Sequence, residues 1–229
     1  MEIEQDSIQQ LQPEFNYVVF EDDIFIAGKK GEGKTTLAIS IMRMIPPGVT
    51  VIVWDFSRKF GNEGIIINKI EDIFLHLGQK IILQATDVSK KNWLRFCKFV
   101  FDNLWNAVVI NDEIHQYLTK QGLEDEHAEF VLSGRNKGLC SISISTGTNT
   151  IPNYVIQNCN HAFAMLHTLK DHVKWLAENI GPECWQLLPQ DKRRQVRAAR
   201  EYWELPNLPP HSYIYRDMHK SNCEVISSS

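Results

Sequence analysis

The sequence lacks the features that mark a membrane-spanning or secreted protein. No segment approaches the ~18 uninterrupted apolar residues that a transmembrane helix needs. The first residues, MEIEQDSIQQLQPEF, are acidic and polar, unlike a secretory signal. We therefore expect a cytoplasmic protein without a membrane span.

The sequence also lacks paired cysteine spacings. Its five cysteines are scattered, and no two of them form a Cys-x-x-Cys motif. An odd, dispersed set predicts reduced thiols in the cytosol and argues against a disulfide framework or a zinc site. The histidines show no metal-binding spacing either, so we expect no metal beyond one that accompanies a nucleotide.

A strong charge of one sign is absent as well. The net charge of −4 argues against a wholly basic nucleic-acid coat but leaves room for a local basic patch. The chain has 229 residues, of which 43% are hydrophobic, so it can form the core of one α/β domain with small appendages.

Apolar runs alternate with segments of helical period along most of the chain. This alternation predicts an α/β fold with a mostly parallel sheet and helices on both faces. The expected strands are residues 24–27, 49–56, 80–87, 107–113, 139–146 and 161–167, and the expected helices are residues 36–44, 93–104, 124–135 and 169–181. We divide the chain into an N-terminal arm (1–20), a core (21–188) and a C-terminal basic helix with a tail (189–229).

A phosphate-binding loop lies between the first strand and the first helix. The spacing G-x-x-x-x-G-K-T runs from Gly28 to Thr35. Glycines allow successive N–H groups to face one anion, Lys34 supplies a positive charge for the β- and γ-phosphates, and the Thr35 hydroxyl is a ligand for Mg²⁺. The alternative is a glycine-rich turn with a chance lysine, which the strand–loop–helix setting disfavours. The predicted nucleotide-binding residues are Gly28, Lys29, Lys30, Gly31, Glu32, Gly33, Lys34, Thr35 and Thr36.

Two acids follow the apolar strand at residues 107–111. Asp112 and Glu113 stand at its carboxyl end, where parallel sheets bind ligands. We expect Asp112, together with Thr35, to hold Mg²⁺, and Glu113 to activate the attacking water. The alternative is that both are ordinary surface acids at a strand end. With a phosphate loop about eighty residues earlier, the pair instead indicates ATP hydrolysis.

The segment LSGRNKGLCSISISTGTNTIPNYVIQNCNHAFAMLH resembles the HerA/FtsK superfamily of DNA-pumping ATPases. The shared features are an arginine, a glycine shortly after it, a strand that ends in a polar residue, a loop with a proline and a further strand. Here they are Arg135, Gly138, residues 139–144 followed by Ser145 and Thr146, Pro152 and HAFAML. The resemblance covers roughly residues 22–170. The short chain is most similar to the genome-packaging ATPases of tailless icosahedral viruses with internal membranes.

The resemblance implies a RecA-like P-loop NTPase core that assembles into a hexameric ring. It implies ATP and Mg²⁺ as cofactors, and an ATP-hydrolysing motor that packages double-stranded DNA into a preformed capsid. Capsid vertex proteins are then candidate partners, and the expected location is the host cytoplasm or the packaging vertex. Arg135 becomes the candidate arginine finger for the site of a neighbouring subunit. Thr146 becomes the candidate sensor, although the family usually has glutamine at that position.

Several alternatives stay open at the level of sequence. Arg135 could pair with the acids of its own helix, in residues 124–129. On one helix, Arg193, Arg197 and Arg200 would form a stripe that follows DNA, but such a charged run is more often a solvated face. Arg58 stands near the position where cellular relatives usually carry an acid. The competing functions are a small-molecule P-loop phosphotransferase and a regulatory nucleotide-binding module that does not pump DNA.

Overall fold

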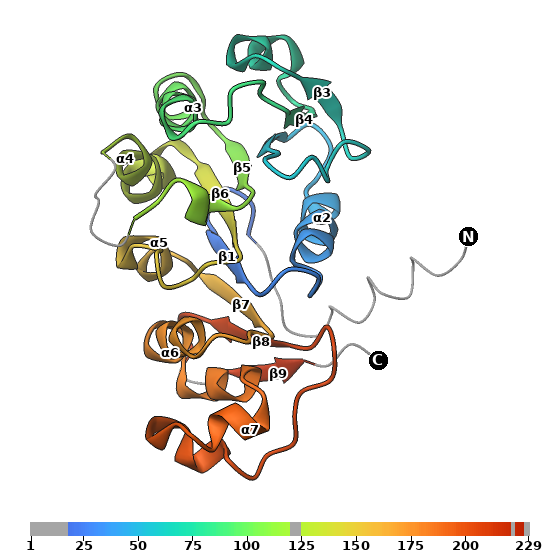
Figure 1. The fold of residues 1–229 in the computed structure, drawn as a ribbon. Coiled ribbons are helices and arrows are strands. Elements are labelled where there is room, and N and C mark those ends of the chain that lie inside the picture. Colours follow the sequence, from blue (N-terminus) through green and yellow to red (C-terminus); the bar gives the residue numbers. More distant parts are fainter. Residues whose placement is uncertain (1–17, 120–124, 221–222, 227–229) are drawn as a thin grey trace.

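The structure, a computed structural model, describes residues 18–119, 125–220 and 223–226, and its centre is one large sheet (Figure 1). Within these residues the sheet has nine strands in the order β3-β4-β2-β5-β6-β1-β7-β8-β9. The strands are β1 (Ile24–Ala27), β2 (Thr50–Trp54), β3 (Ile65–Ile67), β4 (Lys80–Leu83), β5 (Ala107–Asn111), β6 (Leu139–Ser145), β7 (His161–Met165), β8 (Tyr213–Asp217) and β9 (Glu224–Ile226).

The strands from β3 to β7 are parallel, and β8 and β9 add an antiparallel edge. Every residue of β1, β2, β5, β6 and β7 is buried. Continuous burial explains why these strands read as unbroken apolar runs, because helices or loops cover both faces of a parallel sheet. The predicted α/β class with a mostly parallel sheet is confirmed.

Helices flank the sheet on both sides. The α-helices are α2 (Lys34–Met44), α3 (Lys90–Asn103), α4 (Asp125–Ser133), α5 (Asn153–Gln157), α6 (Lys170–Asn179) and α7 (Gln190–Arg193). Short 3-10 helices are η1 (Ile70–His76), η2 (Ile114–Gln116), η3 (Gly134–Lys137), η4 (Pro182–Leu187) and η5 (Arg197–Tyr202). No helix among the residues described is long and apolar enough to cross a membrane.

Two separate cores show which helices cover which face. Ile24 and Ile26 pack in the same cluster as Leu37 and Ile41 of α2. Phe25, between them, packs in the other cluster with side chains of α3 to α6. Because successive strand residues point to opposite faces, β1 is buried from both sides. Figure 1 shows α2 on one side of the sheet and α3 to α6 on the other.

Helix α3 illustrates how the sequence determines these elements. Ser89 caps its start, since the Ser89 hydroxyl accepts a hydrogen bond from Asn92 N at 3.3 Å. Trp93, Phe96, Cys97 and Val100 are buried, at the spacing expected for one face of a helix. This apolar face is core, as its periodicity predicts.

The C-terminal region differs from the sequence prediction. Residues 213–217 and 224–226 pair into the central sheet as β8 and β9, so part of the segment from 189 onward completes the fold of the core. No single basic helix spans residues 192–200. Helix α7 ends at Arg193, the backbone at Val196 is extended with φ −114° and ψ 110°, and η5 begins at Arg197.

The DNA-facing stripe of Arg193, Arg197 and Arg200, one of the alternatives left open by the sequence, therefore does not form. Arg193 is completely buried, and its Nη2 donates hydrogen bonds to Leu205 O at 3.1 Å and Pro206 O at 3.2 Å. The side chain of Arg193 points inward, where its several N–H donors can bond more than one backbone carbonyl at once. Arg193 thus has a structural role and cannot contact DNA from this position.

Candidate nucleotide site

Three strands end at the same edge of the sheet and bring the predicted site residues together. In the parallel register Ala27 of β1 lies beside Ser145 of β6, and Asn111 of β5 lies beside Ser143. The residues that follow these strands are the phosphate loop, the acid pair Asp112–Glu113, and Thr146. Residues up to 118 positions apart in sequence therefore meet at the carboxyl edge, where parallel sheets place ligands.

The glycines of the phosphate loop have the backbone that the motif requires. Gly31 and Gly33 have φ of 92° and 94°, in the left-handed region that favours glycine. Gly33 is also the N-cap of α2, so the positive end of that helix faces the loop. A Cβ atom on Gly28 would lie 2.7 Å from Met165 Cβ, so Gly28 allows β1 and β7 to approach closely.

Lys34 lies inside the loop, where the motif predicts it. Its side chain is almost fully buried, and its Nζ donates a hydrogen bond to Lys29 O at 3.0 Å. Burial lowers the pKa of Lys34, and the neighbouring Glu113 carboxylate acts in the opposite direction. A bound phosphate would add negative charge beside Nζ and favour the protonated amine.

Other loop side chains contact the protein itself. Lys29 forms an ion pair with the buried Glu32 at 3.0 Å, and Glu32 also accepts a hydrogen bond from His211 N at 3.4 Å. His211 has φ of 61°, in the left-handed region. No motif in the sequence indicates that this C-terminal residue borders the phosphate loop. Lys30 and Thr36 are exposed, and Thr35 is half-buried.

Asp112 suits a divalent cation. It is buried, and its Oδ2 accepts a hydrogen bond from Ser57 N at 3.0 Å. Burial raises the pKa of Asp112, and the nearby carboxylates of Glu113 and Asp55 raise it further. A cation between this carboxylate and a bound nucleotide would relieve the repulsion. Mg²⁺ usually binds through one or two protein groups, phosphates and water, which fits Asp112 together with the Thr35 hydroxyl.

Asp55, at the end of β2, has a different task. Its carboxylate accepts hydrogen bonds from Lys59 N at 2.9 Å, Phe60 N at 3.2 Å and Gln84 Nε2 at 2.9 Å. These contacts fix the turn that contains Arg58, whose φ is 56° and whose side chain is exposed. Arg58 therefore stands on a solvent-exposed turn.

Glu113 and Thr146 are in direct contact, although 32 residues separate them. Thr146 Oγ1 donates to the Glu113 carboxylate, with distances of 2.8 Å to Oε2 and 3.0 Å to Oε1. Thr146 N lies 3.2 Å from Oε2 and donates as well. The residues predicted as water-activating base and sensor thus form one unit at the edge of the sheet.

The backbone and charge of Glu113 are both unusual. Its φ of 53° and ψ of 47° place it in the left-handed region, which costs a non-glycine residue ~1–3 kcal/mol. Burial raises the pKa of Glu113, but the contacts with His115 and Thr146 and the charge of Lys34 outweigh it and bring the pKa to about 2. His115 Nδ1 lies 3.2 Å from Oε2. No sequence motif marks His115 as a partner of Glu113, although it follows two residues later.

Aromatic side chains support the strand that carries the acid pair. Trp93 Nε1 donates to Asn111 Oδ1 at 3.2 Å, next to Asp112. Trp54 Nε1 donates to the hydroxyl of Tyr117 at 2.9 Å, and the rings of Trp93 and Tyr117 stack at 4.7 Å. These contacts fix both ends of the segment 111–117 and restrict how far Glu113 can move.

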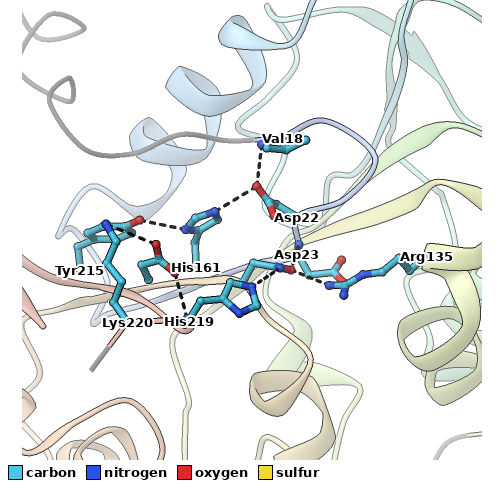
Figure 2. A network of polar contacts seen from close by, with 10 residues as sticks. Val18, Asp22, Asp23, Arg135, His161, Tyr215, His219 and Lys220 are labelled. Atoms are coloured by element: carbon cyan, nitrogen blue, oxygen red, sulfur yellow. Dashed lines mark hydrogen bonds and ion pairs between the residues drawn. The ribbon is translucent and has the colours of Figure 1, made fainter. Parts of the chain in front are cut away.

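Arg135 lies at the opposite edge of the sheet. It belongs to η3, which precedes β6, whereas the phosphate loop follows the carboxyl end of β1. Seven strand residues span about 20 Å, so Arg135 cannot reach the phosphate loop of its own chain. Its side chain is exposed and its Nη2 donates to Asn160 Oδ1 at 2.8 Å, so the contact found is with Asn160, not with the acids of α4 (Figure 2).

Buried acids lie next to Arg135. Asp23 precedes β1, is buried, and accepts a hydrogen bond from Ser141 N at 2.5 Å. Burial raises its pKa from 3.8 to about 6, although the charge of Arg135 lowers it. Asp22, beside it, contacts His161 Nε2 at 3.2 Å (Figure 2).

No protein-family model matches the sequence, and no curated protein matches it by sequence. Solved structures do match the fold. The genome-packaging NTPase B204 of Sulfolobus turreted icosahedral virus 2, in complex with AMPPCP, has a TM-score of 0.68 and 15% identity, over 91% of this chain and 98% of that one. B204 in complex with ATP-gammaS also has a TM-score of 0.68 and 15% identity, over 92% and 98% of the two chains.

A secretion ATPase has a similar fold too. The cytoplasmic domain of the Type VII secretion ATPase EccC of Thermomonospora curvata has a TM-score of 0.57 and 14% identity, over 96% of this chain but 25% of that one. The resemblance read from the sequence is therefore confirmed at the level of fold, and the RecA-like P-loop core is the architecture of this chain.

Asp23→Asn should stabilise the protein at neutral pH. The folded state binds the Asp23 proton more tightly than the unfolded state, so this contribution to stability is complete below about pH 4 and is lost as pH rises through 6. Asparagine stays neutral and can still accept from Ser141 N. In urea unfolding, we expect a gain of up to about 3 kcal/mol at pH 7 that disappears near pH 4.

Asp87 provides the control for this measurement. Hydrogen bonds from Ser89 lower the pKa of this exposed carboxylate, so Asp87→Asn should change stability at pH 7 in the opposite direction. If the free energy of unfolding changes with pH in the same way for the wild type and for Asp23→Asn, Asp23 is not a buried acid with a raised pKa.

Proposed function

We propose that this protein is an ATPase that moves double-stranded DNA, as a genome-packaging motor does. The observation that carries the proposal is the Glu113 carboxylate, held by Thr146 beside Lys34 at the carboxyl edge of the sheet. A carboxylate fixed at this place suits activation of water. A small-molecule phosphotransferase must keep water away from the transferred phosphate, so a carboxylate placed to align water favours hydrolysis over transfer to a small acceptor.

The chain's own groups suffice to bind and orient the nucleotide. The N–H groups of the loop and the start of α2 would hold the phosphates, and Lys34 would neutralise charge on the β- and γ-phosphates. Thr35 and Asp112 would hold Mg²⁺, which supplies Lewis-acid stabilisation of the phosphate oxygens. Lys34 already contacts Lys29 O, so it would exchange this carbonyl for phosphate oxygens on binding.

Glu113 would accept a proton from the attacking water. With a pKa near 2 the carboxylate is ionised at neutral pH, so it is ready to align the water, though it is a weak base in the absence of nucleotide. Phosphate charge beside it would raise its basicity. Thr146 connects this base to β6, so the position of β6 and the alignment of the water are linked.

The position of Arg135 supports action on a neighbouring subunit. The arginine lies exposed at the edge opposite its own phosphate loop. Head-to-tail contacts between copies would place one edge against the other, and such contacts form a ring when the rotation between copies closes. The guanidinium would then stabilise charge on the γ-phosphoryl group of the adjacent subunit. We propose a hexameric ring on this ground and on the family resemblance.

DNA is the proposed partner because of the fold. The neighbour B204 is described as a DNA-packaging ATPase, and its structure aligns over 92% of this chain with a TM-score of 0.67 and 15% identity. By analogy we propose a viral packaging vertex as the place of action, with capsid vertex proteins as further partners.

Duplex DNA should stimulate ATP turnover, and Glu113→Gln should abolish the stimulated rate. The amide keeps the shape of the side chain but cannot accept a proton, so we expect kcat to fall about 100-fold or more while MgATP still binds. The measurement is steady-state phosphate release with and without duplex DNA, together with binding of a fluorescent ATP analogue. Wild-type turnover in Glu113→Gln would remove Glu113 as the base.

Lys34→Ala and Arg135→Ala should each be inactive alone and recover activity when mixed. Lys34→Ala cannot bind the phosphates, and Arg135→Ala leaves transition-state charge unbalanced. Rings assembled from both contain interfaces that pair an intact Lys34 with an intact Arg135. Phosphate release after subunit exchange measures this recovery. If subunits exchange and no activity returns, the two residues do not serve one shared site.

A further inference from the structure

A buried amide holds the exposed guanidinium of Arg135. Asn160 stands at the start of β7 and is almost fully buried, and its Oδ1 accepts the hydrogen bond from Arg135 Nη2 at 2.8 Å. The same oxygen accepts from Asp23 N at 2.9 Å. An exposed arginine normally samples many rotamers, and fixing one costs side-chain entropy. Here a rigid acceptor restricts the guanidinium before any phosphate is present.

The acceptor itself is fixed from three sides. Asn160 N donates to Asp23 O at 2.8 Å, and Asn160 O accepts from Met218 N at 2.8 Å. The Asn160 amide nitrogen lies 3.1 Å from His219 Nε2. Residues next to β1, at the start of β7 and in the connection between β8 and β9 therefore meet at this one side chain. Figure 2 shows Arg135, Asp23 and His219 close to one another.

The charge around Arg135 favours the same orientation. The buried Asp23 lies close enough for the arginine to lower its pKa, so the two groups attract each other. A guanidinium has five N–H donors, and the contact with Asn160 uses Nη2 alone. The remaining N–H groups are the ones that would bind a phosphate of the adjacent subunit.

We propose that Asn160 is a positioning residue for Arg135. It holds the guanidinium in the orientation that reaches the γ-phosphate bound to an adjacent subunit, with Asp23 supporting it by charge. This role rests on the proposed function, because it requires Arg135 to act on that phosphate. In this role Asn160 contacts the guanidinium and acts on the reaction through Arg135 alone.

The test compares kcat and KM for ATP in Asn160→Ala, Arg135→Ala and the double variant, in the full-length protein with duplex DNA. Loss of one hydrogen bond to a charged group should lower kcat roughly 10-fold. KM should change less than about twofold, because the ATP-binding loop of the same chain is untouched. Arg135→Ala should lower kcat about 1,000-fold. Adding Asn160→Ala to Arg135→Ala should then change nothing further.

Two further variants separate positioning from a loss of folding. Asn158→Ala is the matched control, since the Asn158 amide donates to Tyr154 O at 2.7 Å and not to Arg135; it should retain the wild-type kcat. Asn160→Asp keeps an oxygen acceptor for Arg135 and should retain more than about a third of the wild-type kcat. If Asn160→Ala fails to fold, Asn160→Asp decides: a kcat as low as that of Arg135→Ala overturns the proposal.

The remaining outcomes are distinguishable. If Asn160→Ala lowers kcat by the same factor in the wild-type protein and in Arg135→Ala, Asn160 does not act through Arg135. The same conclusion follows if Asn160→Ala changes KM alone. Full activity of Asn160→Ala with a slow Arg135→Ala overturns the positioning role but leaves the proposed function intact. Full activity of Arg135→Ala overturns the arginine finger, and the positioning role with it.

Discussion

The parallel register of the central sheet is the constraint on which the candidate site depends. Ala27 lies beside Ser145 and Asn111 beside Ser143, so three strands end together and deliver their next residues to one edge. A slip of one residue would turn the buried side chains to the wrong face, and both faces are packed, so the register cannot drift. The contact between Glu113 and Thr146 follows from this register together with the left-handed backbone of Glu113.

The same sheet keeps Arg135 away from its own nucleotide site. The phosphate loop follows a strand, and Arg135 precedes a neighbouring parallel strand, so the length of β6 separates them. In the proposed role of Arg135, a single chain would carry two complementary half-sites at opposite edges. Copies that associate head to tail would join these halves, and nucleotide hydrolysis would then depend on assembly. Asn160 lies at the same edge as Arg135, far from the phosphate loop, and its side-chain oxygen accepts hydrogen bonds from Arg135 Nη2 and Asp23 N.

Sequence alone predicted the parts of the site that depend on local pattern. The glycine spacing, the acids after β5 and the polar end of β6 each lie within one strand–loop unit, and the structure brings these residues together at one edge. Contacts across the chain were beyond prediction. Asn160 meets Asp23 over 137 positions, and His211 meets Glu32 over 179. Arg193 was misread because its burial depends on backbone carbonyls of the proline-containing segment that follows it.

The proposed action of Arg135 on an adjacent subunit is tested most directly by the distance between Arg135 and the γ-phosphate in the assembled protein. A structure of the assembly with duplex DNA and a non-hydrolysable ATP analogue provides it. We expect a guanidinium nitrogen of Arg135 to lie within about 3.5 Å of an oxygen of the γ-phosphate that the Lys34 loop of the adjacent subunit binds. The proposed role would be contradicted if the γ-phosphate contacted only the chain whose Lys34 loop binds it, with Arg135 of every neighbouring subunit facing solvent.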